Sequence, residues 1–169
     1  MEKVAKFEKV SEAQFVEGYL DCFRATEEEA VAAYRAVKMP CRATCGSAGY
    51  DLFSTAKIVL APGETVKIPT GIRVRIREGW VLALFPRSGL GFKYRLQLNN
   101  TVGIIDSDYC LSDNEGHIFV KITNDSREGK TLEIPSGGGF AQGIFLPFGV
   151  TEDDAAAGVR NGGFGSTGK

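Results

Sequence analysis

Two carboxylates and a tyrosine follow directly on an apolar, strand-like segment in the run Asn100-Thr101-Val102-Gly103-Ile104-Ile105-Asp106-Ser107-Asp108-Tyr109. A rigid strand can fix the direction in which a carboxylate at its end points. If Asp106 lies within hydrogen-bonding reach of a water, it can act as a general base. The ring of Tyr109 offers a flat face for a sugar or a base. An Asp-Ser-Asp turn between two hairpin strands is the structural alternative for the same residues.

Phosphate chemistry is indicated by a second run, Pro86-Arg87-Ser88-Gly89-Leu90-Gly91. A guanidinium binds phosphate oxygens well, and the glycines allow backbone N–H groups to approach a ligand closely. A surface turn with a salt-bridging arginine would have the same composition.

Two shorter segments carry single polar residues in strand-like surroundings. Asp51 stands beside a tyrosine in Ala48-Gly49-Tyr50-Asp51-Leu52, and Gln142 lies among apolar neighbours in Gly139-Phe140-Ala141-Gln142-Gly143. Taken alone, Asp51 is an ordinary strand-end residue and Gln142 a buried, hydrogen-bonded amide.

The end of the chain is rich in glycine. The last forty-one residues hold 11 of the 21 glycines, and Arg160, Phe164, Ser166 and Thr167 stand among them. Glycine loses the most entropy on ordering, so we expect residues 158–169 to be a mobile arm until a ligand fixes it. One cation, two hydroxyls, free N–H groups and a ring are what is needed to wrap a nucleoside polyphosphate.

The elements that must position these groups change character at Pro40. After it, short runs with two-residue periodicity take over, as in Ile72, Val74 and Ile76, separated by Pro-Gly, Glu-Gly and Asn-Asp turns. Residues 80–85 form a continuous apolar run that suits a sandwich interior. This pattern predicts an all-β fold, either a sandwich, a barrel or a jelly roll.

A helical hairpin is predicted before Pro40, over residues 11–37. Ser11-Glu12-Ala13-Gln14 and Thr26-Glu27-Glu28-Glu29 both fit the capping-box pattern, and apolar residues follow each at helical spacing. The first nine residues alternate loosely and predict an edge strand. The hairpin is either a cap over the β-region or a surface that binds a partner.

Composition favours one soluble domain, 1–169. Twenty basic and 21 acidic residues give a net charge of −1, which provides no general attraction to nucleic acid or to an anionic membrane. Without an apolar run of membrane-spanning length, or the apolar core of a signal peptide, the expected location is cytoplasmic. The four cysteines lack CxxC spacing and only one histidine could join them, so a zinc site is not expected.

Taken together, the five segments resemble, in order, the five motifs of the homotrimeric dUTP diphosphatase (dUTPase) family, and the resemblance runs from Met39 to Gly168. It implies a dUTPase-like jelly roll, a homotrimer with three active sites shared between subunits, and Mg²⁺ as cofactor. The implied activity is hydrolysis of dUTP to dUMP and pyrophosphate, which limits uracil incorporation into DNA and supplies dUMP for thymidylate synthesis.

The resemblance also implies roles for single residues. Asp106 resembles the carboxylate that activates the water attacking the α-phosphorus, and Asp51 the residue that orients the Mg²⁺ shell through water. The ring of Tyr109 packs on the deoxyribose and leaves no room for a 2′-hydroxyl. The remaining residues implied in substrate binding are Arg87, Ser88, Gly89 and Gln142 at the phosphates, Asn100, Gly103 and Ile105 at the uracil edge, Arg160, Gly165, Ser166 and Thr167 at the γ-phosphate, and Phe164 stacked on uracil.

Two departures from the family pattern stand out. Gly139 occupies the place of an arginine in the fourth motif, and residues 110–116 form an insertion after Tyr109. Two other functions remain open at this point. One is a dCTP deaminase-like enzyme, although the third motif lacks the glutamate such chemistry needs, and the other is a dUTP-binding regulatory protein that acts through its helical hairpin.

Overall fold

Antiparallel β-strands dominate the structure, a computed structural model that describes residues 2–158 and 160. The change of periodicity at Pro40 is reproduced, because eleven of the twelve described strands follow it. The prediction of an all-β fold with an N-terminal helical hairpin is therefore confirmed. The strands are β1 (Ala5–Lys9), β2 (Cys41–Arg42), β3 (Tyr50–Phe53), β4 (Ile58–Leu60), β5 (Thr65–Pro69), β6 (Ile72–Ile76), β7 (Trp80–Pro86), β8 (Leu96–Leu98), β9 (Gly103–Ile105), β10 (Phe119–Asn124), β11 (Leu132–Ile134) and β12 (Gly139–Pro147).

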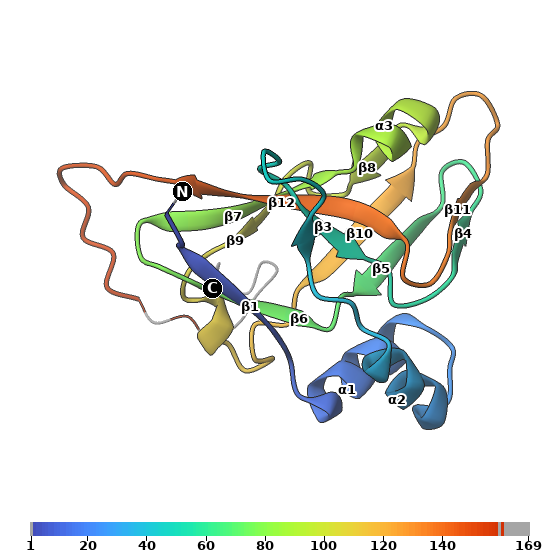
Figure 1. Cartoon of the computed structure of the whole chain (residues 1–169), viewed down its shortest axis with the longest axis horizontal. Coiled ribbons are helices and arrows are strands. Elements are labelled where there is room, and N and C mark those ends of the chain that lie inside the picture. Colours follow the sequence, from blue (N-terminus) through green and yellow to red (C-terminus); the bar gives the residue numbers. More distant parts are fainter. Residues whose placement is uncertain (1, 159, 161–169) are drawn as a thin grey trace.

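Two larger sheets contribute to the main core, together with buried residues of β6 and of the β4–β11 pair (Figure 1). One has the strand order β2-β3-β12-β7-β9 and the other the order β5-β10-β8. Leu82 and Leu84 of β7 are buried in the core with residues from the smaller sheet, and Ala83, which points to the opposite face, is buried as well. Burial on both faces explains why β7 is continuously apolar.

The predicted first strand is also confirmed. β1 pairs antiparallel with β6, from Ala5 opposite Ile76 to Lys9 opposite Ile72. On the outer face, hydrogen bonds from Arg75 and Lys6 lower the pKa of Glu8 to about 2. The strand thus joins the fold by backbone pairing and by an exposed network of charges.

Two helices form the hairpin, α1 (Glu12–Cys22) and α2 (Glu27–Arg35). They lie together at one side of the molecule, beside β5 and β6 (Figure 1). Phe15, fully buried, and Val37 pack with Ile72 of β6 in a second core. The hairpin is therefore attached to the sheets through buried apolar side chains.

The two helix starts differ from each other. Thr26 and Glu29 form the predicted capping box at α2, with both hydrogen bonds present. At α1 only half of the predicted box forms: the Ser11 hydroxyl accepts from the N–H of Gln14, but the N–H of Ser11 donates to Glu115, 104 residues away. A tertiary contact has replaced the local one.

One helix was not predicted. α3 (Ser88–Tyr94) follows β7 directly and ends at Arg95, whose φ of 51° is left-handed. Gly89 and Gly91 stand within it, and each glycine disfavours a helix by about 1 kcal/mol relative to alanine. Propensity thus favoured a turn here. None of the helices within residues 2–158 is long and apolar enough to cross a membrane.

Candidate active site

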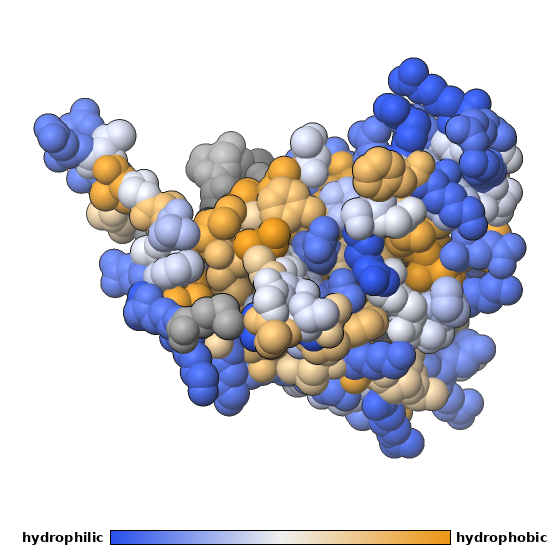
Figure 2. All heavy atoms as spheres, turned by 45° about the horizontal axis from the view of Figure 1, so that its top comes forward, coloured by the Kyte–Doolittle hydropathy of each residue, from blue (hydrophilic) through white to orange (hydrophobic). Residues whose placement is uncertain are grey.

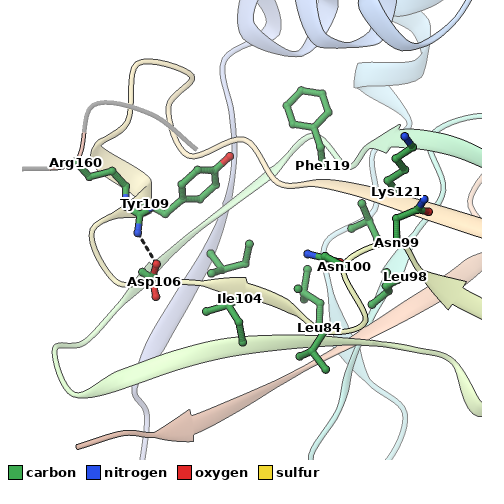
Figure 3. A pocket seen from close by; sticks show the side chains of 14 residues that line it. Leu84, Leu98, Asn99, Asn100, Ile104, Asp106, Tyr109, Phe119, Lys121 and Arg160 are labelled. Atoms are coloured by element: carbon green, nitrogen blue, oxygen red, sulfur yellow. Dashed lines mark hydrogen bonds and ion pairs between the residues drawn. The ribbon is translucent and has the colours of Figure 1, made fainter. Parts of the chain in front are cut away.

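A pocket of about 520 Å³ is lined by residues of β8, β9, the segment that connects them, and β10. Figure 3 shows Asp106, Tyr109 and Arg160 at one end of it and Asn99, Asn100 and Lys121 at the other. Its lining includes the predicted residues Asn100, Gly103, Ile105, Asp106, Tyr109 and Arg160.

β9 places the carboxylate at the pocket. Gly103 and Ile105 are buried, and Ile104 between them is exposed, as in a half-buried strand. Ile105 pairs with Leu82 of β7, so Asp106 begins where a firmly held strand ends. The Asp106 side chain is 46% exposed and can meet solvent or a ligand.

Tyr109 lies in a 3-10 turn (Tyr109–Leu111) just beyond, and its side chain is buried. Its hydroxyl donates to the carbonyl of His117 at 2.8 Å and accepts from the amide of Asn114 at 3.0 Å. Burial raises the pKa of this hydroxyl, which therefore stays protonated at neutral pH. The hydroxyl is anchored in the protein while the residue lines the pocket.

Arg160 comes from the far end of the chain to the same place. Its guanidinium forms an ion pair with Asp106, and its Nε donates to Asp108 at 2.8 Å. It also lies over the ring of Tyr109, 5.9 Å from the centroid. We call Asn100, Asp106, Tyr109 and Arg160 the pocket group.

A second set of predicted residues gathers at the other end of β7. Arg87 Nε lies 3.2 Å from the Asp51 carboxylate, and Gln142 donates to the carbonyl of Pro86 at 3.3 Å. Backbone pairing explains the proximity, because Gln142 of β12 stands opposite both Asp51 of β3 and Phe85 of β7. We call Asp51, Arg87 and Gln142 the Arg87 group.

Gly139 belongs beside this group. A Cβ atom built on it would lie 2.7 Å from Arg87 Nη1, and that same atom donates weakly to the Gly139 carbonyl at 3.4 Å. The Arg87 guanidinium thus occupies the space into which a side chain at position 139, the place of the fourth motif's arginine, would extend. Ser88 and Gly89, also predicted to bind phosphate, are exposed in the first turn of α3 next to it.

The two groups are well separated within one chain. Ile105 is opposite Leu82, and Arg87, directly after the end of β7, lies five residues further along the chain. At about 3.3 Å per residue this is roughly 17 Å of strand. The structure therefore brings the predicted residues together as two groups and not as one.

Some predicted residues lie outside the described part of the chain, and some lining residues were not predicted. The predicted residues outside the described part are Phe164, Gly165, Ser166 and Thr167. The lining residues that were not predicted include Asn99, Phe119 and Lys121. The alternation along β10 could have identified Phe119 and Lys121 as one face, but nothing in the sequence indicated that this face meets the segment between β8 and β9.

Comparisons with known proteins agree with this architecture. The dUTPase family model matches residues 35–168. The deoxyuridine 5′-triphosphate nucleotidohydrolase of Lactococcus lactis is 42% identical over 135 residues, which cover 78% of this chain and 89% of that protein.

Solved structures match over the fold as well. The dUTPase from Streptococcus mutans superposes with a TM-score of 0.63 at 33% identity, over 86% of this chain and 98% of that one. A dUTPase of Staphylococcus bacteriophage 80alpha with dUpNHpp gives 0.59 at 27% identity, over 79% and 93%. The fold is that of the dUTPases, which are nucleotide-hydrolysing enzymes. This chain belongs to the dUTPase family.

Proposed function

We propose that the protein hydrolyses dUTP to dUMP and pyrophosphate by attack of a water on the α-phosphorus. The observation that carries the proposal is the position of Asp106, which follows the half-buried strand β9 and lies, partly exposed, at the edge of a pocket of about 520 Å³. A volume of this size falls within the range of small-molecule sites, roughly 300–1,000 Å³.

The deoxyuridine would lie in the pocket. Asn100 and the backbone of Gly103 and Ile105 supply the polar edge for uracil, and the ring of Tyr109 would pack on the sugar. Because the Tyr109 hydroxyl is held by two hydrogen bonds, the ring cannot easily withdraw to admit a 2′-hydroxyl.

The triphosphate would meet the cationic residues. Arg87, with Ser88 and Gly89 beside it and Gln142 across the sheet, suits the phosphate chain. Arg160 would move from the carboxylates to the γ-phosphate, and residues 158–169, with Phe164, Gly165, Ser166 and Thr167, would close over the bound nucleotide. Closure excludes bulk water and can limit turnover.

Mg²⁺ is the proposed cofactor. Among residues 2–158 and 160, no three His, Cys, Asp or Glu side chains are grouped to hold a metal ion. This fits Mg²⁺, which is commonly bound through substrate phosphates and waters with only one or two carboxylates. Asp51 would orient its water shell, and the ion would offset charge on the triphosphate.

In the chemical step Asp106 accepts a proton from the attacking water. The water oxygen forms a bond to the α-phosphorus while the bond from that phosphorus to the bridging oxygen breaks, and pyrophosphate leaves. The arginines offset the negative charge that develops on the leaving group. Positioning and charge neutralisation carry most of such a reaction.

Each site would be shared between subunits of a homotrimer. Leu82, which is opposite Ile105, and Arg87 are separated by roughly 17 Å of extended chain. This separation favours sites that take the pocket group from one chain and the Arg87 group from another. The segment after β12 leaves the body and exposes Phe148 and Val150 (Figures 1 and 2). Exposed apolar residues of this kind suit an interface between copies.

A nucleotide panel tests the proposal. Pyrophosphate and ammonia release would be measured separately from dUTP, dCTP, dTTP and UTP, with and without Mg²⁺. We expect pyrophosphate from dUTP only with Mg²⁺ and no ammonia from dCTP. Ammonia from dCTP would instead indicate a deaminase, and binding of dUTP without turnover a regulatory protein.

A further inference from the structure

The insertion after Tyr109 surrounds the hydroxyl of that residue. Asn114 donates its amide to the Tyr109 hydroxyl, and the carbonyl of His117 accepts from it. The ring that lines the pocket is therefore held from behind by loop 112–117.

This loop has a fixed shape of its own. The Asn114 carbonyl oxygen accepts from the N–H of Gly116 at 3.1 Å. Glu115 and Gly116 are both left-handed, with φ of 58° and 73°. A Cβ atom at Gly116 would lie 2.5 Å from the Cα of Cys110, so only glycine fits where the loop returns against the turn that carries Tyr109.

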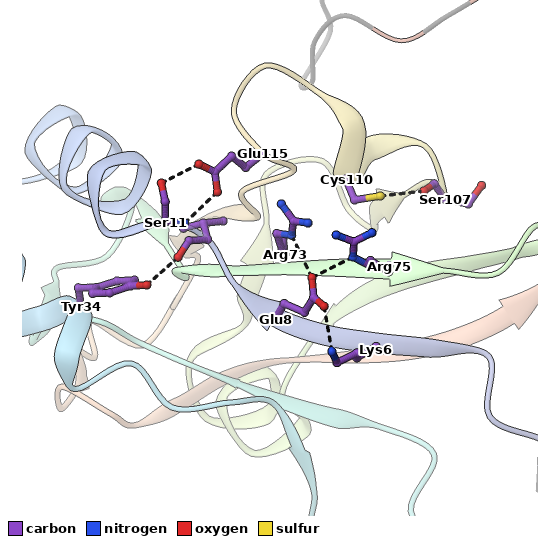
Figure 4. A network of polar contacts seen from close by, with 10 residues as sticks. Lys6, Glu8, Ser11, Tyr34, Arg73, Arg75, Ser107, Cys110 and Glu115 are labelled. Carbon is purple, nitrogen blue, oxygen red and sulfur yellow. Dashed lines mark hydrogen bonds and ion pairs between the residues drawn. The ribbon is translucent and has the colours of Figure 1, made fainter.

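Glu115 ties the loop to the helical hairpin. Its carboxylate accepts from the Ser11 N–H at 2.8 Å and from the Ser11 hydroxyl at 2.6 Å, as Figure 4 shows. Ser11 in turn caps α1. These bonds hold the pKa of Glu115 below its usual value, so the carboxylate is charged at neutral pH.

A second contact joins α1 to the pocket wall. Gly18 is buried, and a Cβ atom there would lie 2.7 Å from the ring of Phe119, a pocket-lining residue, and 3.2 Å from His117. The rings of Phe119 and His117 pack against each other, tilted by 45°, with centroids 4.3 Å apart. Helix α1 thus contacts both His117 and Phe119. The carbonyl of His117 is the group that accepts the hydrogen bond from the Tyr109 hydroxyl.

From this arrangement we propose that loop 112–117 couples the position of α1 to the position of the Tyr109 ring. Asn114 is the residue that positions the ring, and Glu115 is the residue that binds the loop to the helix. The inference rests on the proposed role of Tyr109 against the deoxyribose. The hairpin then contributes to discrimination between dUTP and UTP without touching the nucleotide.

A double-mutant cycle tests this. Asn114→Ala should lower the ratio of kcat/KM for dUTP over UTP about 3- to 10-fold, the size expected from one lost hydrogen bond. In a Tyr109→Phe background, where the hydroxyl is already gone, the same change should alter the ratio less than about twofold. Asp113→Ala, an exposed neighbour in the loop, is the matched control and should leave the ratio unchanged.

A second arm tests the tie to the helix. Glu115→Gln keeps an oxygen for the Ser11 N–H but removes the charge, so it should shift the ratio in the same direction by a smaller factor, again only when the Tyr109 hydroxyl is present. If Asn114→Ala does not fold, this milder variant still tests the inference.

The outcomes separate the two proposals. Equal effects of the Asn114 or Glu115 changes with and without the hydroxyl would show general loop damage and overturn the inference, and so would the absence of any effect. If Tyr109→Ala left the dUTP-to-UTP ratio unchanged, the sugar-packing role of Tyr109 itself would be wrong.

Discussion

The two ends of β7 carry polar groups that differ in enclosure and in support. The pocket group lines a cavity and is backed by loop 112–117 and α1, and its Arg160 meets the carboxylates of Asp106 and of the neighbouring Asp108. The Arg87 group lies beyond the other end of the strand, where the Arg87 side chain is 45% exposed and that of Asp51 21%. In the proposed function, one end selects the nucleoside and the other contacts the phosphates. Neither end alone suffices for the proposed reaction.

The largest effect is expected at the pocket end. Asp106→Asn keeps the shape and removes the base, so kcat should fall about 10²- to 10⁴-fold while dUTP binding is retained. Turnover by pyrophosphate release and binding by calorimetry would be compared with those of Asp153→Asn, an exposed aspartate. Turnover like that of the control would rule out Asp106 as general base.

Mixing subunits tests whether the two ends act together across chains. Asp106→Asn and Arg87→Gln should each be nearly inactive alone. After joint refolding at equal amounts, about a quarter of shared sites would hold an intact residue from each parent. Recovery toward that level supports composite sites, whereas no recovery would place the whole site in one chain.

Removal of residues 160–169 tests the arm. It deletes the cation at Asp106 and the proposed closing segment, so kcat/KM should drop by roughly 10² to 10³, as for the loss of a transition-state donor. The melting temperature should change little, because α1, α2 and both described cores lie before residue 148. A large loss of thermal stability would make the arm structural instead. Arg127→Ala, at an exposed arginine, serves as the control.

His117 tests the support behind the pocket group. It is the only histidine, it is buried with Nε2 accepting from the Gly71 N–H at 2.9 Å, and burial lowers its pKa to about 4. The unfolded chain, with a histidine pKa of about 6.5, takes up the proton first as pH falls. Stability present above about pH 6.5 is therefore lost between there and pH 4, with a loss of about 2 kcal/mol at pH 5.

Urea unfolding at pH 7.5, 6 and 5 measures this loss. His117→Gln can still accept the Gly71 N–H but does not titrate, so its stability should be nearly constant over that interval. A wild-type curve as flat as that of the variant would contradict the assignment. Hydrogen bonds from Ser11 hold the pKa of Glu115 below the ordinary glutamate value of 4.5, and the three pH values chosen all lie above that value.

Local patterns predicted most of the fold. The capping box at Thr26, the alternation along β6 and the apolar run of β7 each have a local physical cause, and each appears in the structure. The structure differs from the prediction in two places. At the Ser11 N–H, a residue distant in the sequence replaces the predicted local hydrogen-bond acceptor, and in α3 a helix forms although its glycines disfavour one. Propensity over a few residues contains neither kind of information.

The candidate site was predictable as a set of residues but not as an arrangement. Asp106 was identified because it follows an apolar strand, and the structure places it at the end of β9. The separation of the pocket group from the Arg87 group depends on the β7–β9 register, and Phe119 and Lys121 enter the pocket only through the packing of β10. Such pairings link residues far apart in the chain, and no local pattern specifies them.

Gly139 has a consequence for how substitutions at this site would combine. A side chain at position 139 and the present Arg87 conformation exclude each other, because a Cβ atom would stand 2.7 Å from the guanidinium. The two positions are therefore coupled, and restoring an arginine at 139 alone would displace the cation already there before adding its own charge. The effects of substitutions at positions 87 and 139 should therefore not be additive.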